Sequence, residues 1–161
     1  MAVSNKPKSD RGSDNTKPIV FIVSARTSIS SPLCSRLHSR GVNTVCISDG
    51  RLAISQYDGS TRPALVILDT NLRESGGMSA REVAIALHRP TRGVEVVFVT
   101  CVVDQFGEHW WFGDVDSFSV RSRTINEVVD DIVTTLVMVK DASTAQANGS
   151  EPANPAIQSL N

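Results

Sequence analysis

The residue best placed to do chemistry in this chain is Asp69, which ends the apolar run ALVIL at positions 64–68. A continuous apolar run that follows Pro63 and leads into a polar loop is typical of a strand buried on both faces, as in parallel sheets. The carboxyl ends of such strands border the crevice in which α/β proteins bind ligands. We therefore expect Asp69 to lie at that edge. The alternative is an aspartate that only accepts hydrogen bonds from the following turn.

Two further polar residues follow predicted strands. Thr100 ends the apolar run at 94–100, and Arg121 follows the weaker, more polar run at 115–120. Because the carboxyl ends of parallel strands meet at one edge of a sheet, we expect both side chains to lie near Asp69. Hydroxyls and arginines are common at strand ends, so neither residue alone indicates a site. The three together favour one.

An alternation of strands and helices must position these residues. The predicted strands cover residues 18–25, 42–48, 64–69, 94–100 and 115–120. Predicted helices lie between them, one stopped by Gly41, one capped by Ser79 and Glu82, and a short or irregular one over the aromatic segment 102–114. A Thr124–Glu127 capping box begins the last helix. Such alternation predicts a flavodoxin-like (βα)5 three-layer α/β sandwich with a five-stranded parallel sheet.

The bulk composition limits the possible classes of protein. The 161 residues carry a net charge of −1, which leaves room for one domain and gives no electrostatic footprint for nucleic acid. Polar segments at 1–17 and 141–161 predict disordered tails around a domain at 18–140. No segment resembles a membrane span or a signal peptide, so we expect a cytoplasmic protein. The three cysteines lack C-x-x-C spacing, which argues against a zinc site or a disulfide framework.

In the order and spacing of its motifs the chain resembles the receiver domain of two-component response regulators, the CheY-like superfamily. The motifs are VILD at 66–69, GGMSARE at 76–82, FVT at 98–100 and DSFSV at 116–120. The resemblance implies that Asp69 matches the phosphoacceptor. It also implies that Thr100 and Arg121 match the residues that contact the phosphoryl group, with arginine in place of the usual lysine, and that Phe118 matches the aromatic switch position.

The chain departs from this family after the first predicted strand. Receivers carry an acidic pair there that binds Mg²⁺, whereas this chain has Ser24, Ala25 and Arg26. Mg²⁺ is usually held by one or two carboxylates with water and phosphate, so Asp69 with a serine hydroxyl is a poor magnesium cage. A bidentate pair between Asp69 and either Arg26 or Arg121 would occupy the acceptor. We therefore expect a degenerate, or pseudo-, receiver with no cofactor and with Mg²⁺ binding lost or weak.

The expected function is that of a stand-alone signalling module, not an enzyme, which binds a histidine kinase, a phosphotransfer protein, another regulator or a second copy of itself. The alternative is a response regulator that is still phosphorylated on Asp69 through an unorthodox cation arrangement. Two other classes remain compatible with the pattern. One is a phosphatase-like reading of Asp69-Thr70-Asn71, which lacks the second carboxylate that general acid catalysis needs. The other is a flavodoxin-like ligand-binding protein, for which a glycine-rich phosphate loop is missing.

The aromatic segment offers a candidate partner surface. Four of the eight aromatic residues fall within seven positions, at Phe106, Trp110, Trp111 and Phe112. Such a cluster usually indicates core, but one short segment cannot bury all four side chains. We therefore predict that at least one tryptophan is exposed and that Trp110 and Trp111 mark a surface for protein binding.

Overall fold

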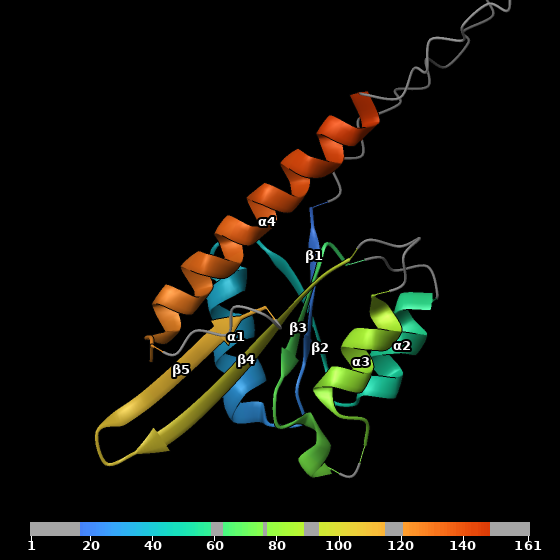
Figure 1. Cartoon of the computed structure of the whole chain (residues 1–161). Coiled ribbons are helices and arrows are strands. Elements are labelled where there is room, and N and C mark those ends of the chain that lie inside the picture. The colour runs from blue at the N-terminus through green and yellow to red at the C-terminus, as the bar shows by residue number, and fades with distance from the viewer. Residues whose placement is uncertain (1–16, 59–62, 76, 89–93, 115–120, 149–161) are drawn as a thin grey trace, which may run out of the picture.

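The computed structural model describes residues 17–58, 63–75, 77–88, 94–114 and 121–148 (Figure 1). Five strands form one sheet in the order β2-β1-β3-β4-β5. Their bounds are Ile19–Val23 for β1, Asn43–Ile47 for β2, Leu65–Asp69 for β3, Glu95–Asp104 for β4 and Gly107–Gly113 for β5. The first four strands in this order, β2, β1, β3 and β4, run parallel. β3 is therefore central and buried at every position, as its apolar sequence predicts.

Helices cover both faces of the sheet, which confirms the predicted three-layer α/β class (Figure 1). Residues of α1 (Thr27–Ser39) and α4 (Ile125–Asn148) share a buried core with one face of the sheet. Residues of α2 (Gly50–Asp58) and α3 (Ala80–Leu87) share a second core with the other face. A short 3-10 helix, η1 (Leu72–Ser75), follows β3. Within the described residues, no helix is both long and apolar enough to cross a membrane.

Local sequence signals account for the helix boundaries. The apolar residues Ile29, Leu33 and Leu37 recur every four positions and are buried on α1, which ends before Gly41 at a φ of +77°. Ser79 and Glu82 form the predicted capping box of α3, with the Ser79 amide donating to Glu82 at 2.7 Å.

The fifth strand differs from the prediction in position and in direction. Residues 102–114 do not form a helix: β4 continues to Asp104, turns over two residues, and returns as the antiparallel strand β5. Asp104 Oδ1 accepts a hydrogen bond from the Phe106 amide at 2.7 Å, and Gly107 takes a φ of +121°. These are the features of a tight turn rather than of a helix. The sheet is therefore not entirely parallel, and the strand predicted at 115–120 lies outside the described residues.

The last helix is longer than predicted. It begins at Ile125 with the expected hydrogen bonds between Thr124 and Glu127, but continues to Asn148, eight residues beyond Lys140. The prediction of a disordered tail from position 141 is therefore wrong for residues 141–148. Their three alanines favour a helix even where it has left the sheet, as the upper part of α4 does in Figure 1. Residues 1–16 and 149–161 lie outside the described part of the chain.

Candidate functional site

Asp69 is the last residue of β3 and is buried, with 1% of its surface exposed. In the register of the sheet Val23 of β1 lies beside Leu68 of β3, so the next residues, Ser24 and Asp69, are neighbours at the carboxyl edge. Ser24 is also buried, and its amide donates to the carbonyl of Ile47 on β2. Two polar side chains thus share one nearly closed site at the edge where the sequence predicts it.

Arg26 binds the Asp69 carboxylate through two hydrogen bonds. Its Nε donates to Oδ2 at 2.9 Å, and its Nη2 donates to Oδ1 at 2.7 Å. Arg26 is the N-cap residue of α1 and has an extended backbone, so the chain turns there from the end of β1 into the helix. A planar guanidinium that contacts both carboxylate oxygens is the strongest geometry available to this pair of side chains.

Two further donors complete the surroundings of Asp69. The Ser24 hydroxyl donates to Oδ2 at 2.7 Å, and the Asn71 amide donates to Oδ1 at 3.0 Å. Each carboxylate oxygen therefore accepts two hydrogen bonds, and a carboxylate offers about four acceptor sites in all. Asp69 has no acceptor site left for a metal or another ligand while Arg26 remains in place.

The side chains around Asp69 do not fit a magnesium site. Mg²⁺ needs oxygen ligands in near-ideal octahedral geometry. The Ser24 hydroxyl is already used, Ala25 has no side-chain oxygen, and Arg26 brings a positive charge to the place of the cation. Across the described ranges, no cluster of three His, Cys, Asp or Glu side chains forms a metal site.

Cys101 also lies near Asp69, although no sequence motif marks it as a site residue. It lies on β4 two residues after Val99, which pairs with Asp69. Burial raises the pKa of the Cys101 thiol, the Glu108 carboxylate raises it further, and the Arg26 guanidinium acts in the opposite direction. The period of two along a strand, which places residues 99 and 101 on one face, was the only signal available.

Thr100 lies on the neighbouring strand but on the other face of the sheet. Successive side chains of a strand alternate between faces, and Val99 belongs to the core under α1 and α4. Asp69 lies on that face also, two residues after Ile67. The Thr100 side chain is therefore directed toward the α2 and α3 face, away from the carboxylate.

Arg121 is not brought to Asp69. Its side chain is 82% exposed, and its Nη2 lies 3.6 Å from Glu127 Oε1 at the start of α4. Two residues later, Arg123 exchanges both backbone hydrogen bonds with Trp110 on the outer edge of β5. Strands β4 and β5 thus lie between this segment and β3, which separates it from Asp69 by about 14 Å at the usual strand spacing. Phe118 lies outside the described residues.

The two tryptophans have different environments. Trp110 is 1% exposed and packs in the core between the sheet and α4, so the prediction that it marks a partner surface is wrong. Its neighbour Trp111 is half-buried on the opposite face, with its ring 6.3 Å from that of His109. The exposed apolar side chains of this segment are instead those of Val102, Val103 and Phe106, at the free end of the hairpin.

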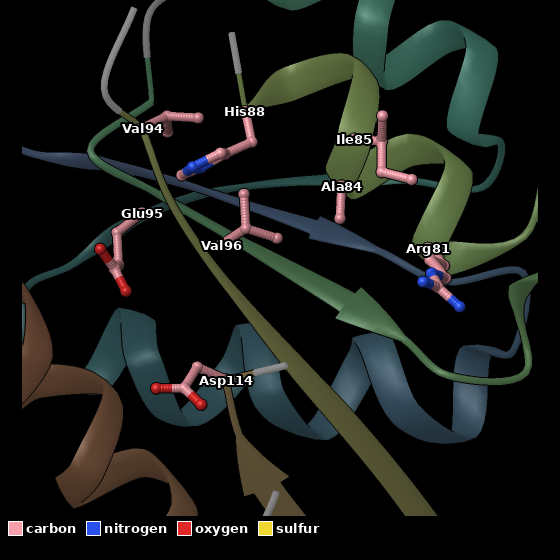
Figure 2. Close-up of a pocket in the computed structure, with 8 residues that line it drawn as sticks. All are labelled: Arg81, Ala84, Ile85, His88, Val94, Glu95, Val96 and Asp114. Carbon is pink, nitrogen blue, oxygen red and sulfur yellow. The ribbon is translucent and has the colours of Figure 1, made fainter. Parts of the chain in front are cut away.

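A pocket of about 460 Å³ lies between α3 and the first residues of β4 (Figure 2). Ala84 and Val96 contribute apolar lining, whereas Arg81 lies on the far side from the carboxylates of Glu95 and Asp114. Glu95 begins β4 and Asp69 ends the parallel strand β3, so the part of the pocket beside Glu95 lies at the opposite end of the strands from Asp69.

Comparisons with known proteins identify the fold and not the family. No protein-family model and no curated protein sequence match the chain. Among solved structures, the N-terminal domain of a response regulator/sensory box/GGDEF three-domain protein from Carboxydothermus hydrogenoformans superposes with a TM-score of 0.57 at 21% identity. The match covers 78% of this chain and 98% of that domain.

Two further structures have a similar fold. A signal receiver domain assigned to the Luxo repressor protein of Vibrio parahaemolyticus gives a TM-score of 0.55 at 18% identity, covering 84% of this chain and 99% of that one. A chain in which a trimeric coiled-coil segment of yeast Spc42 is fused to another protein gives 0.62 at 18% identity, covering 82% and 87%. The chain therefore has the fold of response-regulator receiver domains, at identities too low to carry function with it.

Proposed function

We propose that this chain is a degenerate receiver domain of a two-component or phosphorelay system, which acts by binding a protein partner and not by magnesium-dependent phosphorylation. The observation that supports the proposal is the filled hydrogen-bonding shell of Asp69, in which Arg26 occupies both carboxylate oxygens. The receiver fold supports the class of protein, and the ion pair supports its degenerate status.

Phosphorylation of an aspartate needs two conditions that this site lacks. A carboxylate oxygen must be free to attack the phosphorus, and cations must neutralise the charge that builds on the transferred oxygens. Here Oδ1 and Oδ2 are both engaged, and the guanidinium would have to leave before either could react. Its departure would leave a buried carboxylate uncompensated, which is strongly unfavourable.

The output of such a module is contact with another protein. The hairpin of β4 and β5 projects at one side of the sheet in Figure 1, and it carries exposed Val102, Val103 and Phe106. Exposed apolar groups of this kind are typical of binding surfaces. The partner is a histidine kinase, a phosphotransfer protein, another regulator or a second copy of the chain. The chain acts in the cytoplasm, and neither enzymatic activity nor nucleic-acid binding is part of this role.

Intact-mass measurement after incubation with acetyl phosphate tests this function. The purified chain is treated with and without Mg²⁺, alongside an Asp69→Ala variant whose fold is checked by circular dichroism. The expected result is no phosphoryl adduct on the wild type in either condition. An adduct that requires both Mg²⁺ and Asp69 would overturn the proposal.

The same experiment distinguishes the proposed function from a second candidate, a receiver that is phosphorylated on Asp69 without a metal ion. The observation in its favour is the position of the Arg26 guanidinium, 2.7 Å from Asp69 Oδ1, where it supplies a fixed positive charge. An adduct that depends on Asp69 but persists in EDTA, and that is lost in Arg26→Gln, would identify this mechanism.

A further inference from the structure

Two cysteines approach each other across the contact between α1 and the strand β2. Cys34 lies on α1, with its Sγ 2.9 Å from Thr44 Oγ1 on β2. Cys46 follows Thr44 by two residues, and side chains two apart on a strand share a face. Cys46 therefore lies on the face of β2 that Cys34 contacts, and the Cys34 thiol is near enough to raise the pKa of Cys46.

The position of this pair in the sheet makes it accessible. β2 is an edge strand, since the sheet order begins with it, and Cys46 is exposed while Cys34 is half-buried. Both thiols are free, so both are available to react. A small oxidant in solvent can reach Cys46 without displacing α1, and the thiol next to it is held by a helix and not by a mobile loop.

We propose that Cys34 and Cys46 form an oxidation site in which a peroxide closes an intramolecular disulfide between α1 and β2. Hydrogen peroxide first oxidises the exposed Cys46 thiolate to a sulfenic acid, breaking the O–O bond and releasing hydroxide. The Cys34 sulfur then attacks the Cys46 sulfur and the sulfenic oxygen leaves as water. In total two thiols and one peroxide give one disulfide and two waters, with two electrons passing from sulfur to oxygen.

The local environment of Cys46 determines the rate of this reaction. Partial desolvation of the Cys46 sulfur and the neighbouring Cys34 thiol raise the pKa of Cys46 to about 11 from an ordinary value of 9.0. The thiolate is the reactive form, so little of it is present near neutral pH. The pair is therefore suited to sustained oxidation and not to rapid sensing. The disulfide would fix α1, the helix that begins directly after Arg26, against the edge of the sheet.

Thiol counting on the full-length chain tests the proposal. The protein is treated with hydrogen peroxide, denatured in acid, alkylated with N-ethylmaleimide, and measured by intact mass and peptide mapping. The expected product is a monomer that has lost two hydrogens and carries one maleimide adduct, on Cys101, in place of the three adducts of the untreated chain. A peptide linking Cys34 to Cys46 identifies the bond.

Cysteine variants provide the controls. Cys101→Ser should still form the disulfide, whereas Cys34→Ser and Cys46→Ser should each lose the intramolecular product completely. Because serine preserves the small polar side chain, the folds of these variants can be compared by circular dichroism. The proposal is overturned if the wild type retains three reactive thiols, if its disulfide includes Cys101, if it forms only disulfide-linked dimers, or if Cys46 proceeds to sulfinic acid with Cys34 still reduced.

Discussion

The guanidinium of Arg26 binds the carboxylate of Asp69 in a bidentate pair, in which Nε donates to Oδ2 and Nη2 donates to Oδ1. Arg26 retains some contact with solvent, whereas the Asp69 side chain has none. The pair therefore places a positive charge beside a carboxylate that the fold removes from solvent. This relationship determines both the stability of the site and the ligands it can accept.

Removal of the arginine should be costly. We expect Arg26→Ala to lower the free energy of unfolding by about 3 kcal/mol, because it leaves a buried carboxylate without its counter-charge. Urea denaturation followed by circular dichroism measures the change. Arg121→Ala is the matched control, since it removes an arginine that is exposed beside Glu127, and it should leave the midpoint unchanged. Equal effects of the two substitutions would contradict the structural importance given to Arg26.

An acidic group in place of Ser24 should create a cation site. In Ser24→Asp/Arg26→Ser the new carboxylate would lie beside Asp69, where the Ser24 hydroxyl now lies 2.7 Å from Oδ2. Two carboxylates at one edge suit Mg²⁺, so saturating Mg²⁺ should raise the melting temperature of the variant by about 2–5 °C through binding to the folded state. The wild type should not respond. Adding Asp69→Asn to the variant should abolish the shift, and a folded variant without any shift would argue against this site.

Substitution of two aromatic residues of the hairpin should change the free energy of unfolding by very different amounts. Trp110 is 1% exposed, so Trp110→Ala should cost about 3–5 kcal/mol of unfolding free energy. Phe106 is 80% exposed at the turn, so Phe106→Ala should change that free energy by less than about 0.5 kcal/mol. Urea unfolding of both variants tests the register of β5, because a helix through this segment would not produce this pattern. If the Phe106→Ala variant is folded, any loss of partner binding that it shows can be attributed to the missing side chain and not to unfolding.

The capping boxes should make the protein sensitive to acid. Hydrogen bonds from Ser79 lower the pKa of Glu82, and hydrogen bonds from Thr124 lower that of Glu127. A carboxyl group whose pKa is lower in the folded state stabilises the fold above its unfolded pKa, and this contribution is lost as the pH falls through the folded value. The melting temperature should therefore decline below about pH 4.5, the ordinary value for both groups.

A double variant isolates this effect. Glu82→Gln/Glu127→Gln keeps an acceptor for the capping hydrogen bonds but removes the titrating groups. Its melting temperature is recorded by differential scanning calorimetry between about pH 3 and pH 6, the range in which carboxyl groups titrate. This temperature should fall less steeply with acid than that of the wild type. Identical slopes would mean that other carboxyl groups dominate the acid response.

Much of the fold could be predicted because its signals are local. The unbroken apolar run before Asp69 indicates a central strand, and the four-residue spacing of Ile29, Leu33 and Leu37 indicates a buried helix face. The hairpin was missed because its strands carry no clear alternation of apolar and polar residues. The turn signal, Asp104 three residues before Gly107, is weak by itself and is equally compatible with the end of a short helix.

The direction of β5 also decides which of the two candidate arginines reaches Asp69. The sequence suggested that either Arg26 or Arg121 could pair with Asp69, and the choice depends on the direction of β5. Since β5 runs antiparallel, the chain returns along its outer edge at Arg123 and does not reach the edge that holds Asp69. Hydrophobic patterns indicate that a segment is a strand but do not give its direction. The contact of Arg26, by contrast, follows from its position directly after β1.

The two-residue connection between β4 and β5 also has a consequence for how the chain folds. Two parallel strands can pair only after the long connection between them has folded back. Asp104 and Gly107 are separated by only two residues, so they can pair on the microsecond timescale typical of hairpins. Pairing in this hairpin joins residues close in sequence and lowers the contact order of that half of the sheet, which favours faster folding. The edge of the sheet that carries Trp110 can therefore form early, as a template against which α4 later docks.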